Sequence, residues 1–186
     1  MAGRTPTEAY FELIDPIQEA LNFIAVGRLT LGKDARGIRP GTAEIVTLND
    51  GDPATLLSPL AGPLLLTVSL RVMAHKIDVG RDSYHCQVVG YWYTLYTADE
   101  REVIAYHWTP EVSGNQRAFP HLHVGSVVAA SSRVAGNTFN KLHIPTGVVS
   151  VAAFVRFAVE ELGVEARSGL DRGAVLAYLN RWAPNG

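Results

Sequence analysis

Histidine is the residue type in this chain whose spacing suggests chemistry. All six histidines of the 186-residue sequence fall between positions 75 and 143. The most informative pair is His121 and His123, because residues two apart in a strand project from the same face, here together with Phe119. Imidazole titrates near neutral pH and is also a common metal ligand. Two adjacent imidazoles therefore predict either proton transfer or metal binding at this segment.

Two further histidines could complete such a site. His107 lies in a segment typical of a strand, and His143 stands a few residues before Ser150, a good helix N-cap. This spacing predicts that His143 lies at the start of a helix, where backbone N–H groups can bind an anion. In the favoured mechanism, one of His121 and His123 acts as the base, and His143 or His107 acts as the acid.

Basic residues on both sides of the histidine segment predict binding of a phosphate. Arg117 precedes His121, and Lys141 directly precedes the segment of His143. Cationic side chains suit this role because negative charge grows on phosphate oxygens in the transition state. The predicted substrate-binding residues are Arg117, Lys141 and Tyr106, the neighbour of His107. Solvated loop charges are the alternative for the two basic residues.

Two other interpretations of the histidines stay open. A third histidine would give a metal site with an open position, although no metal ligand is assigned and the cofactor is left undetermined. The histidine motif has no neighbouring carboxylate, which argues against the usual non-haem iron ligand sets. Alternatively, the histidines are ordinary surface residues of a sheet, and the chain is a non-catalytic component that binds a protein partner through apolar segments such as residues 127–130.

Composition excludes several classes of protein. Hydrophobic residues make up 47% of the chain and charged residues 18%, which predicts a packed core rather than disorder. The net charge of −2 lacks the positive excess of a DNA-binding surface, so DNA is not an expected partner. Cys86 is the single cysteine, which leaves no intrachain disulfide. The longest apolar run is too short to cross a membrane, and the N-terminus lacks a secretory pattern, which predicts a cytoplasmic protein.

The pattern of elements predicts an α+β fold formed by residues 1–186 as one domain. Residues 63–128 show alternation and β-branched or aromatic runs, with a short hairpin loop at residues 98–100, which predicts an antiparallel β-meander sheet. Residues 28–62 are rich in Gly, Pro and Asp and are predicted to be loop, with one strand at residues 42–48.

Helices are predicted on both sides of the sheet segment. In the N-terminal helical region at residues 7–27, Asp15 and Pro16 predict a new helix start, with a shorter helix before it. Residues 150–183 predict two C-terminal helices, the first capped by Ser150 and carrying an apolar stripe from Val151 to Leu162. We expect these helices to pack on the sheet.

The order of motifs from Tyr91 to Gly163 resembles the TumE family of toxins from bacterial toxin–antitoxin pairs. The resemblance rests on the aromatic strand Tyr91-Trp92-Tyr93, a hairpin at Asp99, Tyr106-His107, the motif Phe119-Pro120-His121-Leu122-His123-Val124-Gly125 and a closing amphipathic helix. It covers less than half of the chain, which is longer than the family pattern and carries an insertion at residues 128–140. It implies a toxin-like hydrolase, a ribonuclease acting on RNA, with His121 and His123 in the site and a cognate antitoxin as partner.

Overall fold

The computed structural model describes residues 3–33, 35–77, 83–110, 119–125, 143–167 and 169–182. In chain order the elements are α1 (Pro6–Asn22), β1 (Leu29–Leu31), β2 (Ala43–Leu48), the 3-10 turn η1 (Asn49–Gly51), β3 (Ala54–Leu56), β4 (Leu64–Lys76), β5 (Tyr84–Thr97), β6 (Glu102–Trp108), β7 (His121–Val124), β8 (His143–Pro145), α3 (Val151–Glu160) and α4 (Arg172–Trp182). These elements confirm the predicted α+β class.

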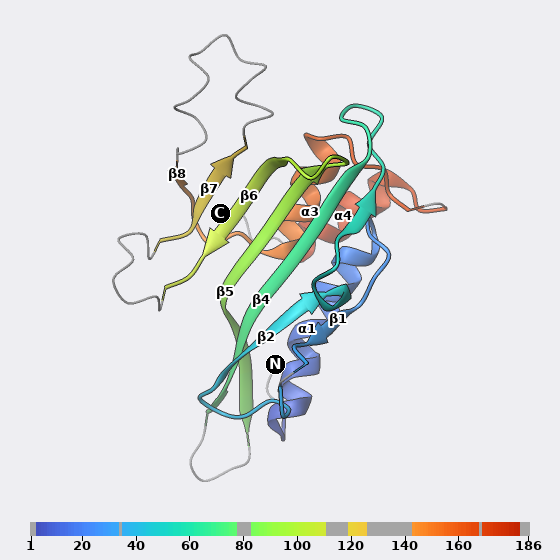
Figure 1. Cartoon of the computed structure of the whole chain (residues 1–186). Helices are drawn as coiled ribbons and strands as arrows, with labels where there is room; N and C mark the ends of the chain where they lie inside the picture. The colour runs from blue at the N-terminus through green and yellow to red at the C-terminus, as the bar shows by residue number, and fades with distance from the viewer. Residues whose placement is uncertain are drawn as a thin grey trace.

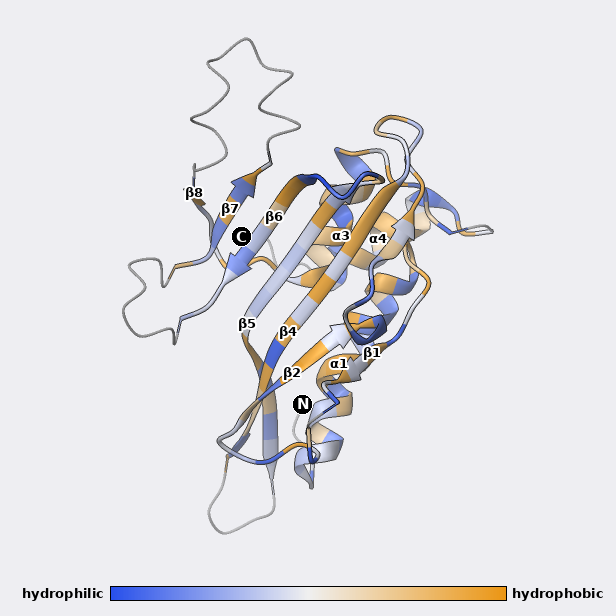
Figure 2. Cartoon of the chain, in the orientation of Figure 1, coloured by the Kyte–Doolittle hydropathy of each residue, from blue (hydrophilic) through white to orange (hydrophobic). Residues whose placement is uncertain are grey.

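One antiparallel sheet contains the eight strands. Its order is β1-β2-β4-β5-β6-β7-β8, and β3 pairs with β4 beside this path. From β4 to β8 each strand pairs with the next along the chain, so the predicted meander is confirmed. Alternation explains why these segments form strands: β4 switches between buried and half-buried positions along almost its whole length, and its colours alternate in the same way in Figure 2.

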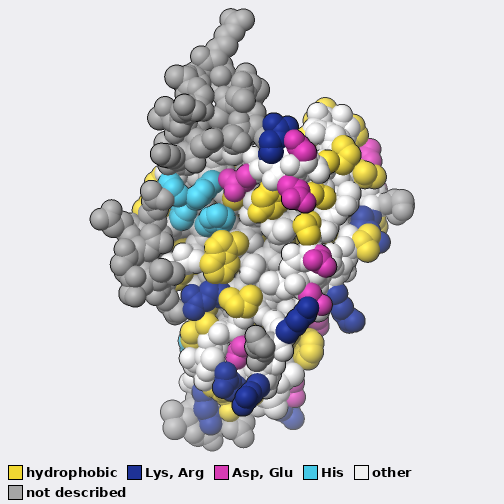
Figure 3. Space-filling model, viewed as in Figure 1, with side chains coloured by type: hydrophobic (Ala, Val, Ile, Leu, Met, Phe, Trp, Pro, Cys, Tyr) yellow, Lys and Arg dark blue, Asp and Glu magenta, His cyan; other side chains and the backbone are white. Residues whose placement is uncertain are grey.

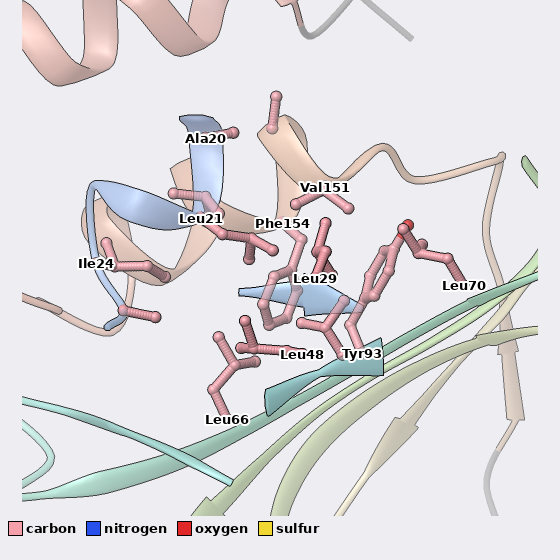
Figure 4. Close-up of a cluster of buried hydrophobic side chains, with 14 of the residues drawn as sticks. Ala20, Leu21, Ile24, Leu29, Leu48, Leu66, Leu70, Tyr93, Val151 and Phe154 are labelled. Atoms are coloured by element: carbon pink, nitrogen blue, oxygen red, sulfur yellow. The ribbon is translucent and has the colours of Figure 1, made fainter. Parts of the chain in front are cut away.

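The helices lie on one face of this sheet, and none of the described helices lies on the opposite face (Figure 1). Phe154 of α3 is fully buried and packs against Tyr93 of β5 and Tyr106 of β6, with ring centroids 5.3 Å and 6.0 Å away. Figure 4 shows Leu21 and Phe154 pointing from α1 and α3 toward the sheet. Helix α4 adds Val175 and Leu179 to the same cluster of buried residues. The hydrophobic core therefore lies between the helices on one side and the sheet on the other.

The N-terminal segment is one helix, and the predicted break at Pro16 is wrong. Helix α1 runs from Pro6 to Asn22 with Pro16 inside it, and its N-cap is Thr5, whose Oγ1 accepts a hydrogen bond from the Glu8 N–H at 3.1 Å. An internal proline costs about 3 kcal/mol because it removes a backbone hydrogen bond. Burial of apolar side chains on both sides of the proline offsets that cost; these are Ala9, Tyr10, Ile14, Ala20 and Leu21.

Residues 28–62 contain more sheet than predicted. Besides β2, the short strands β1 and β3 pair with β2 and β4. The side chain of Asn49 also ties this region to the end of α1, since its Oδ1 accepts from the Arg28 N–H and its amide donates to the Val26 carbonyl. Three residues are too few to show alternation, so β1 and β3 could not be predicted from their own residues.

In the part of the chain that the structure describes, no helix combines the length and the apolar character needed to span a membrane.

Candidate functional site

Strand register brings four histidines onto the face of the sheet opposite the helices. His107 of β6 stands directly opposite His121 of β7, and His123 of β7 stands opposite His143 of β8. Side chains that face each other across antiparallel strands, or lie two apart along one strand, share a face. Two cross-strand pairs on three adjacent strands therefore form one histidine cluster, defined here as His107, His121, His123 and His143.

The rings of the histidine cluster are in mutual contact. The centroids of His123 and His143 are 4.1 Å apart, and that of His107 lies 4.6 Å from His123. His121 lies 5.0 Å from His123, 4.9 Å from His143 and 5.9 Å from His107. The side chains form one patch on the face of the sheet opposite the helices (Figure 3). The predicted proximity of His121 and His123 to a third histidine is confirmed, and both His107 and His143 lie close to them.

A backbone hydrogen bond fixes the orientation of His121. This side chain is only 6% exposed, and its Nδ1 lies 2.9 Å from the Phe119 carbonyl oxygen. A carbonyl can only accept, so Nδ1 carries the proton and Nε2 keeps its lone pair. Metal-binding histidines typically show this arrangement, in which one ring nitrogen donates to a carbonyl and the other faces the ion.

Electrostatics keep His107 neutral. The pKa of His107 is lowered to about 4, first by burial and then by the nearby His121 and His143, because a second positive charge is unfavourable beside them. At neutral pH this imidazole is therefore uncharged. The neutral form is the one that ligates metal ions or accepts a proton.

The positions of the ring nitrogens fit a metal ion. His107, His121 and His123 each offer one nitrogen, and these three atoms lie within 4.8 Å of one another. Zinc bonds of about 2.0–2.1 Å in a tetrahedron place ligand nitrogens about 3.3 Å apart and ring centroids about 5 Å apart. The observed centroid distances lie on both sides of that value, so small side-chain rotations would bring the three nitrogens within bonding distance of one ion. Among the described residues this group contains histidines only.

Other predicted site residues lie elsewhere. Tyr106 belongs to the opposite, helix-covered face, where its ring packs 6.0 Å from Phe157 of α3; alternation along β6 separates it from His107. His143 lies in β8 and not at a helix start, because α3 begins at Val151. That prediction is wrong, since residues 143–145 pair as a strand with β7. Arg117 and Lys141 lie outside the described residues, as does the apolar segment 127–130.

The remaining titratable candidates are far from the histidine cluster. His75 and His85 stand opposite each other where the end of β4 pairs with the start of β5, and His75 contacts the Gln87 amide at 3.0 Å. Cys86 is buried, and burial raises the pKa of its thiol. His75, His85 and Cys86 therefore add no functional group to the histidine cluster.

Gly125 is a positioning residue that sequence reasoning missed as part of the site. A Cβ on Gly125 would lie 1.7 Å from the backbone oxygen of Glu102, so only glycine lets the end of β7 approach β6. Its N–H donates to the Val103 carbonyl at 2.9 Å. The Val124-Gly125 step after the two histidines was the available signal, because glycine in a strand indicates a close backbone approach.

Comparison of the chain with protein-family models, with curated proteins and with solved structures gives no match. The resemblance to the TumE family accordingly stays a prediction.

Gly125→Ala is expected to lower the free energy of unfolding by about 1–3 kcal/mol, because the added methyl group collides with backbone that cannot move independently of β6. Urea denaturation measures this change. Gly147→Ala is the matched control, since a Cβ there meets no atom within 4 Å. Equal effects of the two substitutions would contradict the close approach of β6 and β7.

The free energy of unfolding of the metal-free protein should decrease as the pH is lowered below neutral. The pKa of His107 is about 4 in the folded protein, against about 6.5 for an unperturbed histidine. Between these values the unfolded chain binds more protons, so the free energy of unfolding decreases as pH falls and is fully recovered above about 6.5. Urea midpoints at neutral and mildly acidic pH measure the decrease. It should be smaller in His107→Gln, whose side chain cannot be protonated, and an unchanged decrease would count against a neutral His107.

Proposed function

We propose that this chain is a hydrolase whose histidine cluster binds a divalent transition-metal ion and cleaves RNA. The observation that carries the proposal is the set of three imidazole nitrogens, from His107, His121 and His123, that lie within 4.8 Å of one another on two paired strands. A sheet holds such ligands more rigidly than loops do, which reduces the entropic cost of assembling a metal site.

The donor set favours zinc among the common ions. Imidazole nitrogens suit zinc, copper, nickel and iron, whereas magnesium and calcium prefer oxygen ligands. The group of ligand atoms in the described residues contains histidines and no carboxylate. We therefore take zinc as the reference ion.

His107, His121 and His123 would hold the ion. A zinc ion held there would lower the pKa of a water molecule to about 7 and so supply hydroxide at neutral pH. His143 lies beside the three ligands, 4.1 Å from His123 and 4.9 Å from His121 by ring centroids. Its imidazole would act as the general base that takes a proton from the attacking water and as the general acid that returns it to the leaving oxygen.

RNA as the substrate follows from the resemblance to the TumE family, in which His121 and His123 are the matching positions. The same resemblance supports a cognate antitoxin as protein partner. These two assignments share one origin, so evidence against the resemblance would count against both. The metal site rests on geometry and is independent of them.

A metal-free ribonuclease is the second candidate. It is favoured by the contact between His123 and His143, the shortest ring separation of the histidine cluster at 4.1 Å. Two adjacent imidazoles can act as general base and general acid on one substrate that contacts both rings. In that mechanism the 2′-hydroxyl loses its proton to one histidine, and the leaving 5′-oxygen receives a proton from the other.

Metal removal and reconstitution separate the two candidates. Protein stripped with a chelator should bind about one zinc ion per chain, and RNA cleavage by the stripped protein should appear only after zinc is restored. His143→Gln should retain the ion and lower kcat by about 10²–10⁴-fold, the usual contribution of a general acid–base group. Full cleavage by the stripped protein would support the metal-free candidate. Failure to cleave RNA with zinc bound would refute RNA as the substrate and leave the metal site standing.

A further inference from the structure

A second pocket lies on the helix-covered side of the sheet, away from the histidine cluster. It has a volume of about 290 Å³ and lies between α1, β5 and the segment that joins β8 to α3. The walls are mostly apolar; they include Leu13, Ile17, Val88, Tyr91, Val149 and Val151. Ligand pockets in proteins combine such walls with a few polar groups that fix orientation.

Tyr91 supplies one of the polar groups of this pocket, whose lining also includes Tyr93 and Ser150. Its ring is 1% exposed and stacks on Tyr93 at 4.6 Å, which fixes its direction. The hydroxyl oxygen accepts a hydrogen bond from the Val149 N–H at 3.0 Å. Within the described part of the chain the hydroxyl proton has no acceptor. Burial also raises the pKa of Tyr91, so this proton is retained at physiological pH.

The charge at the pocket limits what can enter. Glu12 is the one charged side chain among the described lining residues, and it is exposed. Val148 and Trp182 line the pocket and are 65% and 45% exposed, which indicates that the mouth lies beside them. An anionic ligand would lose hydration among apolar walls and meet the Glu12 carboxylate, so both effects oppose it.

We propose that this pocket binds a small neutral molecule with an apolar body and one hydrogen-bond acceptor, such as the carbonyl of a ketone or ester. At the packing density of protein interiors, about 290 Å³ holds about a dozen non-hydrogen atoms. The acceptor accepts a hydrogen bond from the Tyr91 hydroxyl, and the apolar body lies against Val88 and the α1 side chains. The proposal does not depend on the histidine cluster or on any hydrolase activity.

Titration with 4-phenylbutan-2-one tests this assignment on the full chain, with calorimetry and Trp182 fluorescence as readouts. We expect a dissociation constant of about 0.1–1 mM, as is usual for a ligand of this size. The carboxylate analogue 4-phenylbutanoate and the amine analogue 4-phenylbutylamine should bind at least about tenfold more weakly, because each carries a charge into an apolar pocket. Tighter binding of either charged analogue would overturn the proposed ligand class.

Substitutions locate the binding to this pocket. Tyr91→Phe should weaken ketone binding about threefold to tenfold, the usual effect of one hydrogen bond. Tyr84→Phe is the matched control, since Tyr84 lies on the same strand outside the pocket and should bind as the wild type does. Val88→Phe and Leu13→Phe should each abolish binding by filling the pocket, and both positions are half-buried, so a larger ring can be accommodated. Ketone binding that persists in either folded filling variant, or is missing in the wild type, would overturn the proposal.

Discussion

His121→Ala/His123→Ala is expected to abolish zinc binding and RNA cleavage together. The two imidazoles provide two of the three nitrogens that lie within 4.8 Å of one another, and no carboxylate in this group can replace them. Loss of an outer-shell partner of a metal ligand already costs about 10–100-fold in affinity, so loss of two ligands should exceed about 100-fold. Zinc content after dialysis and the cobalt(II) absorption spectrum of the substituted protein measure the loss.

A third cross-strand histidine pair, outside the histidine cluster, provides the control for this experiment. His75 and His85 stand opposite each other on β4 and β5, as His107 and His121 do on β6 and β7. His75→Ala/His85→Ala removes the same number of imidazoles from the same sheet and should leave zinc binding and cleavage unchanged. If the double substitution at His121 and His123 leaves one zinc ion bound, the histidine cluster is not the metal site.

Phe154→Ala is expected to lower the free energy of unfolding by about 3–5 kcal/mol, the usual cost of truncating a fully buried aromatic residue. Phe154 is 0% exposed and fills the space between α3 and the sheet, in contact with Tyr93 and Tyr106. The surrounding strands cannot collapse into the cavity without breaking their ladder of hydrogen bonds. Urea or thermal denaturation of the metal-free protein measures the change.

Phe11 of α1 is the matched control for this substitution. It is the same residue type on a helix, but it is 52% exposed. Phe11→Ala should change the free energy of unfolding by only about 0.5 kcal/mol, as surface substitutions usually do. Similar losses for Phe154 and Phe11 would mean that α3 does not supply the main buried contact with this part of the sheet.

The sequence by itself determined which faces of the local elements are apolar. Alternation in β4 and helical spacing in α3 are properties of neighbouring residues, so the strand, the helix and the Ser150 cap could all be predicted from short windows. The same alternation placed His121 and His123 on one face. Their distance of 5.0 Å follows from a spacing of two along a strand.

Predictions from short stretches of sequence were wrong where long-range packing overrides the local preference of the residues. Pro16 normally ends a helix, but buried residues on both sides of it hold α1 together as one helix. The strands β1 and β3 have three residues each and exist because β2 and β4 offer them unpaired edges. Neither outcome can be derived from the residues within one turn or one strand.

Only the tertiary structure decided which histidines join His121 and His123. His143 is 20 positions from His123, yet the two stand opposite each other and their rings are 4.1 Å apart. Such a contact depends on register, and a slip of one residue would move an imidazole to the helix-covered face. Register is set by the packing of the whole sheet and by the close approach that Gly125 permits, so the spacing of histidines in the sequence could suggest the site but could not assemble it.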